Sequence, residues 1–245
     1  MLENVAAGFK HPNILDVKLG ARLWADDAPA AKRRKLEEVA GRTTSGSLGF
    51  RIAGMKIRHH DEHEQEQEHV QEDLAHVDVK NGYKSYTKLY GQSFNHDNVL
   101  DAFTTYIGGV HQDPTTGKRI FRRKRAHIIV KRFVRELESI QYVLENEESR
   151  MYSASVLMVY EADEEALERG LQEEENEQET NHEPDGEDEE DGDDDDDDDD
   201  VIPQKVHEVR LIDFAHASWT PGEGPDENSL TGIRNMVRIL RELVS

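Results

Sequence analysis

Two short segments, far apart in the sequence, combine residue types that could perform chemistry. The first is Pro-Asn-Ile-Leu-Asp-Val-Lys-Leu-Gly at 12–20, and the second is Leu-Ile-Asp-Phe-Ala-His at 211–216. Each pattern predicts a buried strand that presents an acid near its end. Asp16 and Lys18 are two residues apart, so on an extended chain their side chains share a face. With Asp213 they would supply the carboxylates and the cation that metal-assisted phosphoryl transfer requires.

These residues also have simpler interpretations. An Asp-x-Lys pair on a strand is usually a surface ion pair. Asp213 lies between Ile212 and Phe214, so we expect it beside a buried strand, where a carboxylate needs compensation. It could be a functional acid or a structural acid paired to backbone or to a base. His216 could face the same cleft or be a structural histidine.

The net charge of −23 is concentrated in one stretch of the chain. Residues 161–200 hold 25 of the 53 acids and one base, Arg169, so this stretch carries −24 and the remainder about +1. It ends in eight consecutive aspartates. Such a run cannot bury apolar surface and repels itself, so we expect a disordered acidic insertion at 162–204.

Composition excludes several kinds of protein and site. The 245 residues contain no cysteine, which excludes disulfides, thiolate metal sites and cysteine nucleophiles and fits a reducing compartment. No apolar run approaches the length of a membrane span, and the N-terminus has no signal-peptide pattern. We therefore expect a soluble intracellular protein without a membrane partner, built from one domain with or without tails.

Hydrophobic periodicity predicts a mixture of strands and helices without regular βαβ alternation, which favours an α+β fold with an antiparallel or mixed sheet. A polar stretch at 59–80 is predicted to be a surface insertion, and 43–47 a turn. The stripe Ile129, Phe133, Leu137, Ile140 and Leu144 marks the strongest helix. The predicted strands are 12–20, 48–57, 151–160 and 206–214, and the predicted helices are 28–40, 97–107, 120–146 and 229–244.

Two basic stretches and one histidine-rich stretch have alternative interpretations. The cluster at 32–35 is a solvated helix face or a clamp for a multiply phosphorylated small molecule. The basic stretch at 118–135 is mainly the exposed face of a long helix, with a partner or nucleic-acid role disfavoured because its aromatic residues are few. His59 and His63 have helical chelate spacing, but their segment is nearly devoid of apolar residues. The GxxxxGK(S/T), GxGxxG, HExxH and GxSxG motifs are absent.

Taken together, these segments resemble the inositol polyphosphate kinase family. Its signature PxxxDxKxG is matched at Pro12, Asp16, Lys18 and Gly20, and its IDFAH motif at 212–216. Residues 43–55 look like the segment typical of the multikinase branch, especially its fungal members, and 88–91 (Lys-Leu-Tyr-Gly) resembles the KxYG patch. Ala-Ser-Val-Leu at 154–157 departs from the family's SSLL and keeps Ser155 and Leu157.

The resemblance implies an ATP- and Mg²⁺-dependent kinase of inositol tris- and tetrakisphosphates. Asp16, Lys18 and Asp213 would be the catalytic residues, with the metal on Asp213. Asp16 would contact the nucleotide or orient the attacking hydroxyl, and the resemblance leaves both open. Glu3 and Val5 would belong to the hinge that receives adenine. Inositol phosphates would be held by Lys18, Lys32, Arg33, Lys35, Lys88 and His216.

The resemblance also implies a domain organisation. Residues 1–161 and 205–245 would form the C-terminal lobe of the kinase, with 1–5 as the hinge and 28–41 as the inositol-phosphate-binding helix. In this family a β-rich N-terminal lobe precedes the hinge, and here the chain begins at Met1. We therefore expect a truncated product with weak activity.

Other functions remain open at this point. A non-catalytic interaction protein could bind transcription factors or other basic proteins through the acidic tract, and acidic partners through the basic helix. The tract could equally be a solubilising spacer. A protein kinase lacks its HRD and DFG motifs here, and a nucleic-acid binder would show steep salt dependence. The resemblance places the protein in the nucleus and cytoplasm.

Overall fold

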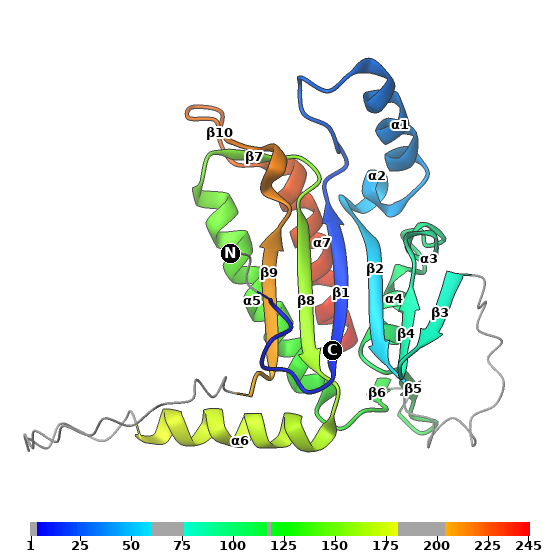
Figure 1. The fold of residues 1–245 in the computed structure, drawn as a ribbon, viewed down its shortest axis with the longest axis vertical. Helices are drawn as coiled ribbons and strands as arrows, with labels where there is room; N and C mark the ends of the chain where they lie inside the picture. Colours follow the sequence, from blue (N-terminus) through cyan, green and yellow to red (C-terminus); the bar gives the residue numbers. More distant parts are fainter. Residues whose placement is uncertain (1–3, 60–75, 117–118, 181–203) are drawn as a thin grey trace, which may run out of the picture.

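The computed structural model describes residues 4–59, 76–116, 119–180 and 204–245. Its centre is a six-stranded sheet in the order β3-β4-β2-β1-β8-β9, in which every neighbouring pair is antiparallel (Figure 1). The strands are β1 Pro12–Leu19, β2 Phe50–Arg58, β3 Val77–Lys80, β4 Tyr83–Tyr86, β8 Ser155–Glu161 and β9 His207–Ile212. The predicted α+β fold is confirmed, and the sheet is antiparallel rather than mixed.

Strand β1 shows how the sequence pattern positions a site. Its residues alternate between fully buried side chains, such as Leu15 and Val17, and half-buried ones, such as Asp16 and Lys18. Because successive side chains point to opposite faces of a sheet, the apolar set anchors the strand in the core. The same alternation places Asp16 and Lys18 together on the other face.

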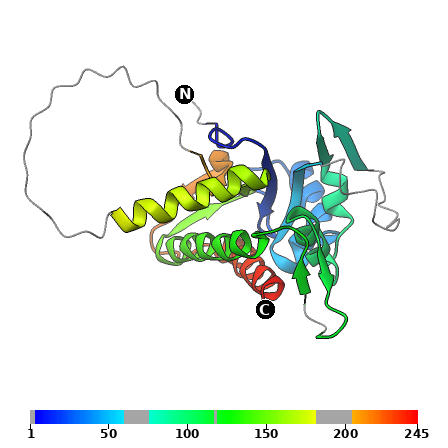
Figure 2. The ribbon, with the colours of Figure 1, turned by 90° about the horizontal axis from the view of Figure 1, so that it is seen from below.

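Helices cover one face of this sheet. They are α4 Val99–Tyr106, α5 Ala126–Asn146 and α7 Glu227–Leu243. Figure 2 shows α5 and α7 side by side on one face, while the N-terminal segment lies on the opposite face. The predicted apolar stripe of α5 is in the core, with Phe133 and Leu137 fully buried, and Leu230 and Ile233 of α7 are fully buried as well. The opposite face, called the uncovered face below because none of these three helices lies on it, is therefore available to a site.

Shorter elements complete the fold. Two small two-stranded sheets pair β5 with β6 and β7 with β10, and a 3₁₀ turn follows β9. The remaining bounds are α1 Ala30–Gly41, α2 Thr44–Leu48, α3 Lys88–Gln92, β5 Val110–Gln112, β6 Arg119–Phe121, β7 Ser149–Met151, α6 Glu164–Thr180, the 3₁₀ turn Phe214–His216 and β10 Ala217–Trp219.

Two predicted boundaries are wrong for identifiable reasons. Residues 43–47 are not a simple turn, because α2 forms there and ends at Gly49 in the left-handed conformation (φ 72°). A Cβ at Gly49 would lie 2.8 Å from the backbone nitrogen of Gly232, so only glycine lets α7 approach this closely. The long helix begins at Ala126 rather than 120, because Arg125 adopts a positive φ of 67° and 119–121 pair with β5.

The prediction of disorder across 162–204 is wrong for its first part. Residues 164–180 form α6, which runs across one end of the sheet (Figure 1). Its apolar residues Ala166, Leu167 and Leu171 are buried. The prediction failed because the acidic composition of the stretch outweighed these few apolar residues. The rest of that prediction, 181–203, lies outside the described residues.

The predicted polar insertion at 59–80 is also revised. Residues 60–75 lie outside the described residues, whereas Val77–Lys80 form strand β3, which pairs with β4 at the sheet edge. Strand β3 (Val-Asp-Val-Lys) alternates over only four residues and β4 (Tyr-Lys-Ser-Tyr) does not alternate, so neither gives a strong strand signal in the sequence. In the part of the chain that the structure describes, no helix has both the length and the apolar character needed to cross a bilayer.

Candidate functional site

The structure brings Asp16, Lys18 and Asp213 together at one end of the sheet. The register pairs Lys18 with Ser155, and Ser155 with Ile212, so the end of β1 lies two strands away from the residue that precedes Asp213. Lys18 Nζ lies 3.2 Å from Asp213 Oδ2. Two strand ends that are remote in the sequence therefore form one cluster.

Backbone geometry fixes both partners of Lys18. Its ammonium donates a 2.7 Å hydrogen bond to the Ser153 carbonyl as well as contacting Asp213. Ser153 (φ 60°) and Asp213 (φ 68°) both adopt left-handed conformations, which are uncommon for residues other than glycine and cluster at functional sites. The expectation that Asp213 lies beside a buried strand is wrong, because β9 has no fully buried residue and the Asp213 side chain is 56% exposed. Its carboxylate can therefore receive a ligand from outside.

Asp16 differs from Asp213 in its environment. Burial is the main cause that raises the pKa of the Asp16 carboxyl, and the nearby Asp213 carboxylate adds to it, while the Ser155 hydroxyl, Lys18 and Arg51 oppose the rise. Among the described residues, no hydrogen bond reaches Asp16 Oδ1, although this atom is buried. A buried carboxylate oxygen without a partner is costly unless an electropositive group binds it.

The two carboxylates fit a hard divalent cation. Mg²⁺ prefers oxygen ligands, and proteins commonly hold it through one or two carboxylates together with substrate phosphates. Asp213 offers an exposed oxygen, and Asp16 offers a buried one without a partner. No group of three or more acidic or histidine side chains suited to a metal occurs in the described ranges. With these two carboxylates, water and phosphate oxygens would complete the coordination of Mg²⁺.

Arg51 is a further cation at this site that the motif search did not single out. It lies on β2 opposite Lys18 in the register and donates to the Ser45 hydroxyl over 3.0 Å. Burial lowers the pKa of its guanidinium, and the charge of Asp16 opposes that change. The only sequence signal was a basic residue on the polar face of a predicted strand.

The predicted substrate-binding residues occupy two different settings. Figure 1 places α1 beyond the end of the sheet where β1 and β9 finish. Lys32 and Lys35 are exposed on α1. Arg33 instead turns inward, donates 2.7 Å to the Ala28 carbonyl and lies 4.8 Å above the Trp24 ring. It therefore stabilises the loop before α1.

Lys88 and His216 both come from short helical turns. Lys88 is the exposed first residue of α3, which packs on β2 so closely that a Cβ at Gly91 would lie 2.0 Å from the Ile52 carbonyl oxygen. His216 is exposed in the turn that follows Asp213, and its carbonyl accepts a hydrogen bond from Tyr152 N over 3.3 Å. The turn thus carries His216 to the same end of the sheet as Asp213.

Position 20, the last of the signature, requires glycine for a structural reason. Its φ is +91°, and a Cβ there would lie 2.4 Å from Asn228 Nδ2. Asn228, near the start of α7, accepts hydrogen bonds from Ala21 N (2.9 Å) and Arg22 N (2.8 Å) and donates to the Arg22 carbonyl (3.0 Å). This asparagine holds the loop that leads from β1 to α1. Sequence reasoning missed it because it belongs to no motif.

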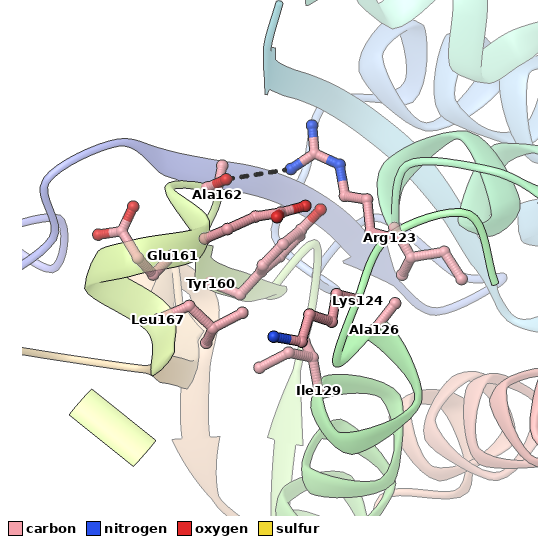
Figure 3. A pocket seen from close by; sticks show the side chains of 10 residues that line it. Arg123, Lys124, Ala126, Ile129, Tyr160, Glu161, Ala162 and Leu167 are labelled. Carbon is pink, nitrogen blue, oxygen red and sulfur yellow. Dashed lines mark hydrogen bonds between the residues drawn. The ribbon is translucent and has the colours of Figure 1, made fainter. Parts of the chain in front are cut away.

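The predicted nucleotide hinge is described only in part. Glu3 lies outside the described residues, whereas Val5 is half-buried in the N-terminal segment 4–11. That segment crosses β8 and β9 on the uncovered face (Figures 1 and 2). The pocket in Figure 3 is not part of this site, because its lining residues Tyr160 and Glu161 end β8 at the opposite end of the sheet from Asp213.

Comparison with known sequences gives a consistent result. A family model described as "Inositol polyphosphate kinase" matches residues 1–241. The inositol polyphosphate multikinase of Saccharomyces cerevisiae is 37% identical over 250 residues, which cover 98% of this chain and 66% of that protein. Inositol hexakisphosphate kinase 1 of Rattus norvegicus is 28% identical over 99% of this chain and 51% of its own length. The chain thus spans about half to two thirds of these relatives.

Comparison with solved structures agrees. The crystal structure of the inositol phosphate multikinase Ipk2 from S. cerevisiae, in complex with ADP and Mn²⁺, matches with a TM-score of 0.70 and 32% identity over 100% of this chain and 83% of that one. A second inositol phosphate multikinase structure matches with a TM-score of 0.60 at 20% identity and supports the fold alone.

Proposed function

The chain belongs to the inositol polyphosphate kinase family, and we propose that it transfers the γ-phosphoryl group of ATP to hydroxyls of inositol tris- and tetrakisphosphates. The observation that carries this proposal is the convergence of Asp16, Lys18 and Asp213 on the uncovered face of the sheet. Phosphoryl transfer needs little covalent chemistry from the protein, so positioning and charge neutralisation account for catalysis.

Each member of the cluster has a distinct role in this proposal. Asp213, with its exposed carboxylate, would hold Mg²⁺, and the unpartnered oxygen of Asp16 would complete the protein's share of the ligands. The metal, when bound, neutralises the charge of the nucleotide phosphates. Lys18 is held by the Ser153 carbonyl and by Asp213, so its ammonium would need little reorganisation to neutralise the charge that phosphoryl oxygens gain in the transition state.

The substrate and the nucleotide would bind on either side of this cluster. Lys32, Lys35, Lys88 and His216 would hold inositol phosphates, since all four are exposed and the first two extend from α1 beyond the site. Arg33 contributes indirectly, because its guanidinium is committed to the loop before α1. Val5, with Glu3, would receive the adenine of ATP.

The experiment is ATP-dependent phosphorylation of inositol trisphosphate by the purified chain with Mg²⁺, followed by separation of the labelled products. Inositol tetrakisphosphate and then pentakisphosphate are the expected products. The Asp213→Asn protein, prepared in parallel, distinguishes turnover by this site from a contaminating kinase. Absence of product from the folded parent chain contradicts the proposed function.

A second role, in binding basic proteins such as transcription factors in the nucleus and cytoplasm, depends on the acidic stretch. One observation bears on it. Two arginines of the basic stretch are already paired with α6, Arg125 with Glu168 over 2.8 Å and Arg132 with Glu174 over 2.5 Å. Helix α6 therefore neutralises part of the basic stretch within the molecule. This favours partner binding through the acidic residues that follow α6 in the sequence rather than through the basic stretch.

A further inference from the structure

We propose that Glu161 is a positioning residue for the nucleotide side of the site, because its buried carboxylate fixes the N-terminal segment 4–11, which carries Val5, against the sheet. The inference rests on the proposed function, in which Val5 belongs to the adenine-binding hinge. It adds a residue that no motif contains and that does not itself contact substrate.

The carboxylate of Glu161 has an unusual set of partners. The residue is fully buried. Its Oε1 accepts hydrogen bonds from His11 N (2.9 Å) and Asp163 N (2.8 Å), and its Oε2 accepts from Lys10 N (2.6 Å) and Gln204 Nε2 (3.1 Å). Each carboxylate oxygen therefore accepts two hydrogen bonds. Charge-assisted bonds of this kind from N–H groups stabilise a carboxylate more strongly than bonds between neutral groups.

Neighbouring contacts attach the same segment at further points. Lys205 N donates to the Gly8 carbonyl over 2.9 Å, and Ala162 N donates to the His11 carbonyl over 3.0 Å. Lys10 also pairs with Asp163 over 2.9 Å. The N-terminal segment is thus held by residues 161–163 and 204–205, which lie where the chain leaves and re-enters the sheet around α6.

The surroundings of Glu161 indicate that its role is to hold the N-terminal segment. In Figure 3 its carboxylate points away from Arg123 and Lys124, the cations that line the pocket beside it. Arg123 instead donates to the Ala162 carbonyl over 3.3 Å. Three of the four donors to Glu161 are backbone N–H groups, and two of these belong to the N-terminal segment. The residue therefore acts on backbone position rather than on a neighbouring charge.

Glu161→Gln changes this arrangement with almost no change in volume. The amide nitrogen replaces one oxygen and directs its hydrogens at two N–H donors, so two hydrogen bonds are lost and buried donors are left without acceptors. We expect the N-terminal segment to loosen and the KM for ATP to rise on the order of tenfold. We expect the KM for inositol trisphosphate and kcat at saturating ATP to change less than about threefold.

Asp226→Asn is the matched control. Asp226 is also a buried carboxylate, and it accepts hydrogen bonds from Met151 N (2.8 Å) and Ser229 N (3.1 Å), far from the N-terminal segment. The Asp226→Asn variant should lower thermal stability at least as much as Glu161→Gln does, while leaving the KM for ATP unchanged. Gln204→Ala, which removes a single donor, provides a milder variant if Glu161→Gln fails to fold.

The experiment compares parent, Glu161→Gln, Gln204→Ala and Asp226→Asn by steady-state kinetics, by Mg-ADP affinity and by amide hydrogen exchange of residues 4–11. A selective rise in KM for ATP, with faster exchange of this segment, supports the inference. An active parent whose KM for ATP is unaltered by Glu161→Gln overturns it. An inactive parent contradicts the proposed function instead, and the inference is then decided by whether Glu161→Gln weakens Mg-ADP binding relative to Asp226→Asn.

Discussion

Lys18 Nζ lies 3.2 Å from Asp213 Oδ2, although the two residues are 195 positions apart in the sequence. The contact joins the end of the central strand β1 to the end of the edge strand β9. It also orients the Lys18 ammonium beside the one exposed carboxylate of the cluster. The proposed chemistry depends on this pair and on Asp16 behind it.

Asp213→Asn should abolish activity and keep the fold. The carboxylate is half-exposed, the Ser153 carbonyl still accepts a hydrogen bond from Lys18 when the charge of Asp213 is removed, and asparagine tolerates the left-handed backbone at this position (φ 68°). We expect kcat to fall on the order of 10²–10³-fold or more, as when a group that stabilises transition-state charge is removed. Kinetics and circular dichroism on the same preparation measure both effects. Loss of secondary structure would identify Asp213 as a structural acid.

Asp16→Asn should abolish activity without lowering stability at neutral pH. Because the fold raises the pKa of the Asp16 carboxyl above 3.8, the protonated form is the one that the folded state favours. This contribution to stability is complete below the unfolded pKa and is lost as pH rises through the folded pKa. Asparagine imitates the protonated form, so the variant should be at least as stable as the parent at pH 7.

Thermal unfolding of both proteins between pH 4 and pH 8 tests this sign. The stability difference in favour of Asp16→Asn should grow as the pH rises and then level off. A variant that is less stable than the parent at pH 7 would mean that the ion pairs of Asp16 with Lys18 and Arg51 outweigh its burial.

Gly20→Ala should destabilise the chain more than its backbone conformation alone requires. The added Cβ meets Asn228 Nδ2 at 2.4 Å, in addition to the strain of a positive φ. Gly222 is a matched control, since it has a comparable φ of +87° and nothing within 4 Å of an added Cβ. We expect Gly20→Ala to cost roughly 1–3 kcal/mol more than Gly222→Ala in the free energy of unfolding, measured by urea denaturation. Equal costs would show that Asn228 moves aside freely.

Two deletions should separate the acidic tract from the helix that precedes it. Removal of 181–203 with a short glycine-serine connection leaves α6 in place, so thermal stability and turnover should remain close to those of the parent. Removal of 164–203 also deletes Leu167 and Leu171, which are buried. It should cost roughly 2–4 kcal/mol in the free energy of unfolding. A loss of turnover in the shorter deletion would contradict the view that the tract is dispensable for catalysis.

The parts of the fold that were predictable from sequence are those with strong local patterns. The stripe through Phe133 and Leu137 predicted α5, and the alternation from Pro12 to Leu19 predicted β1. Asp16, Lys18 and Asp213 were selected by residue type and position at strand ends, and the structure brings them together. These signals succeed because periodic burial and a charged strand end both follow directly from side-chain direction along the chain.

Other parts depend on contacts between remote residues, which a local pattern does not record. The acidic α6 is ordered by three apolar residues and by ion pairs with Arg125, which precedes α5, and with Arg132 of α5. The helix start at Ala126 depends on the left-handed Arg125. Arg51, Asn228 and Glu161 are single polar residues in ordinary surroundings of sequence, and their roles appear only when the partners that they contact are known.

The strand order has a consequence for biosynthesis. Strand β1 pairs on one side with β2, which follows it closely, and on the other with β8, which is made more than a hundred residues later. Asp213 and Asn228 are translated later still. A ribosome-bound chain therefore exposes one edge of β1 until β8 has emerged, and it leaves the leucines on the buried side of β1 without their α7 partners for longer still. Chaperone binding to this nascent edge would protect it, because non-local strand pairing is slow and open edges promote aggregation.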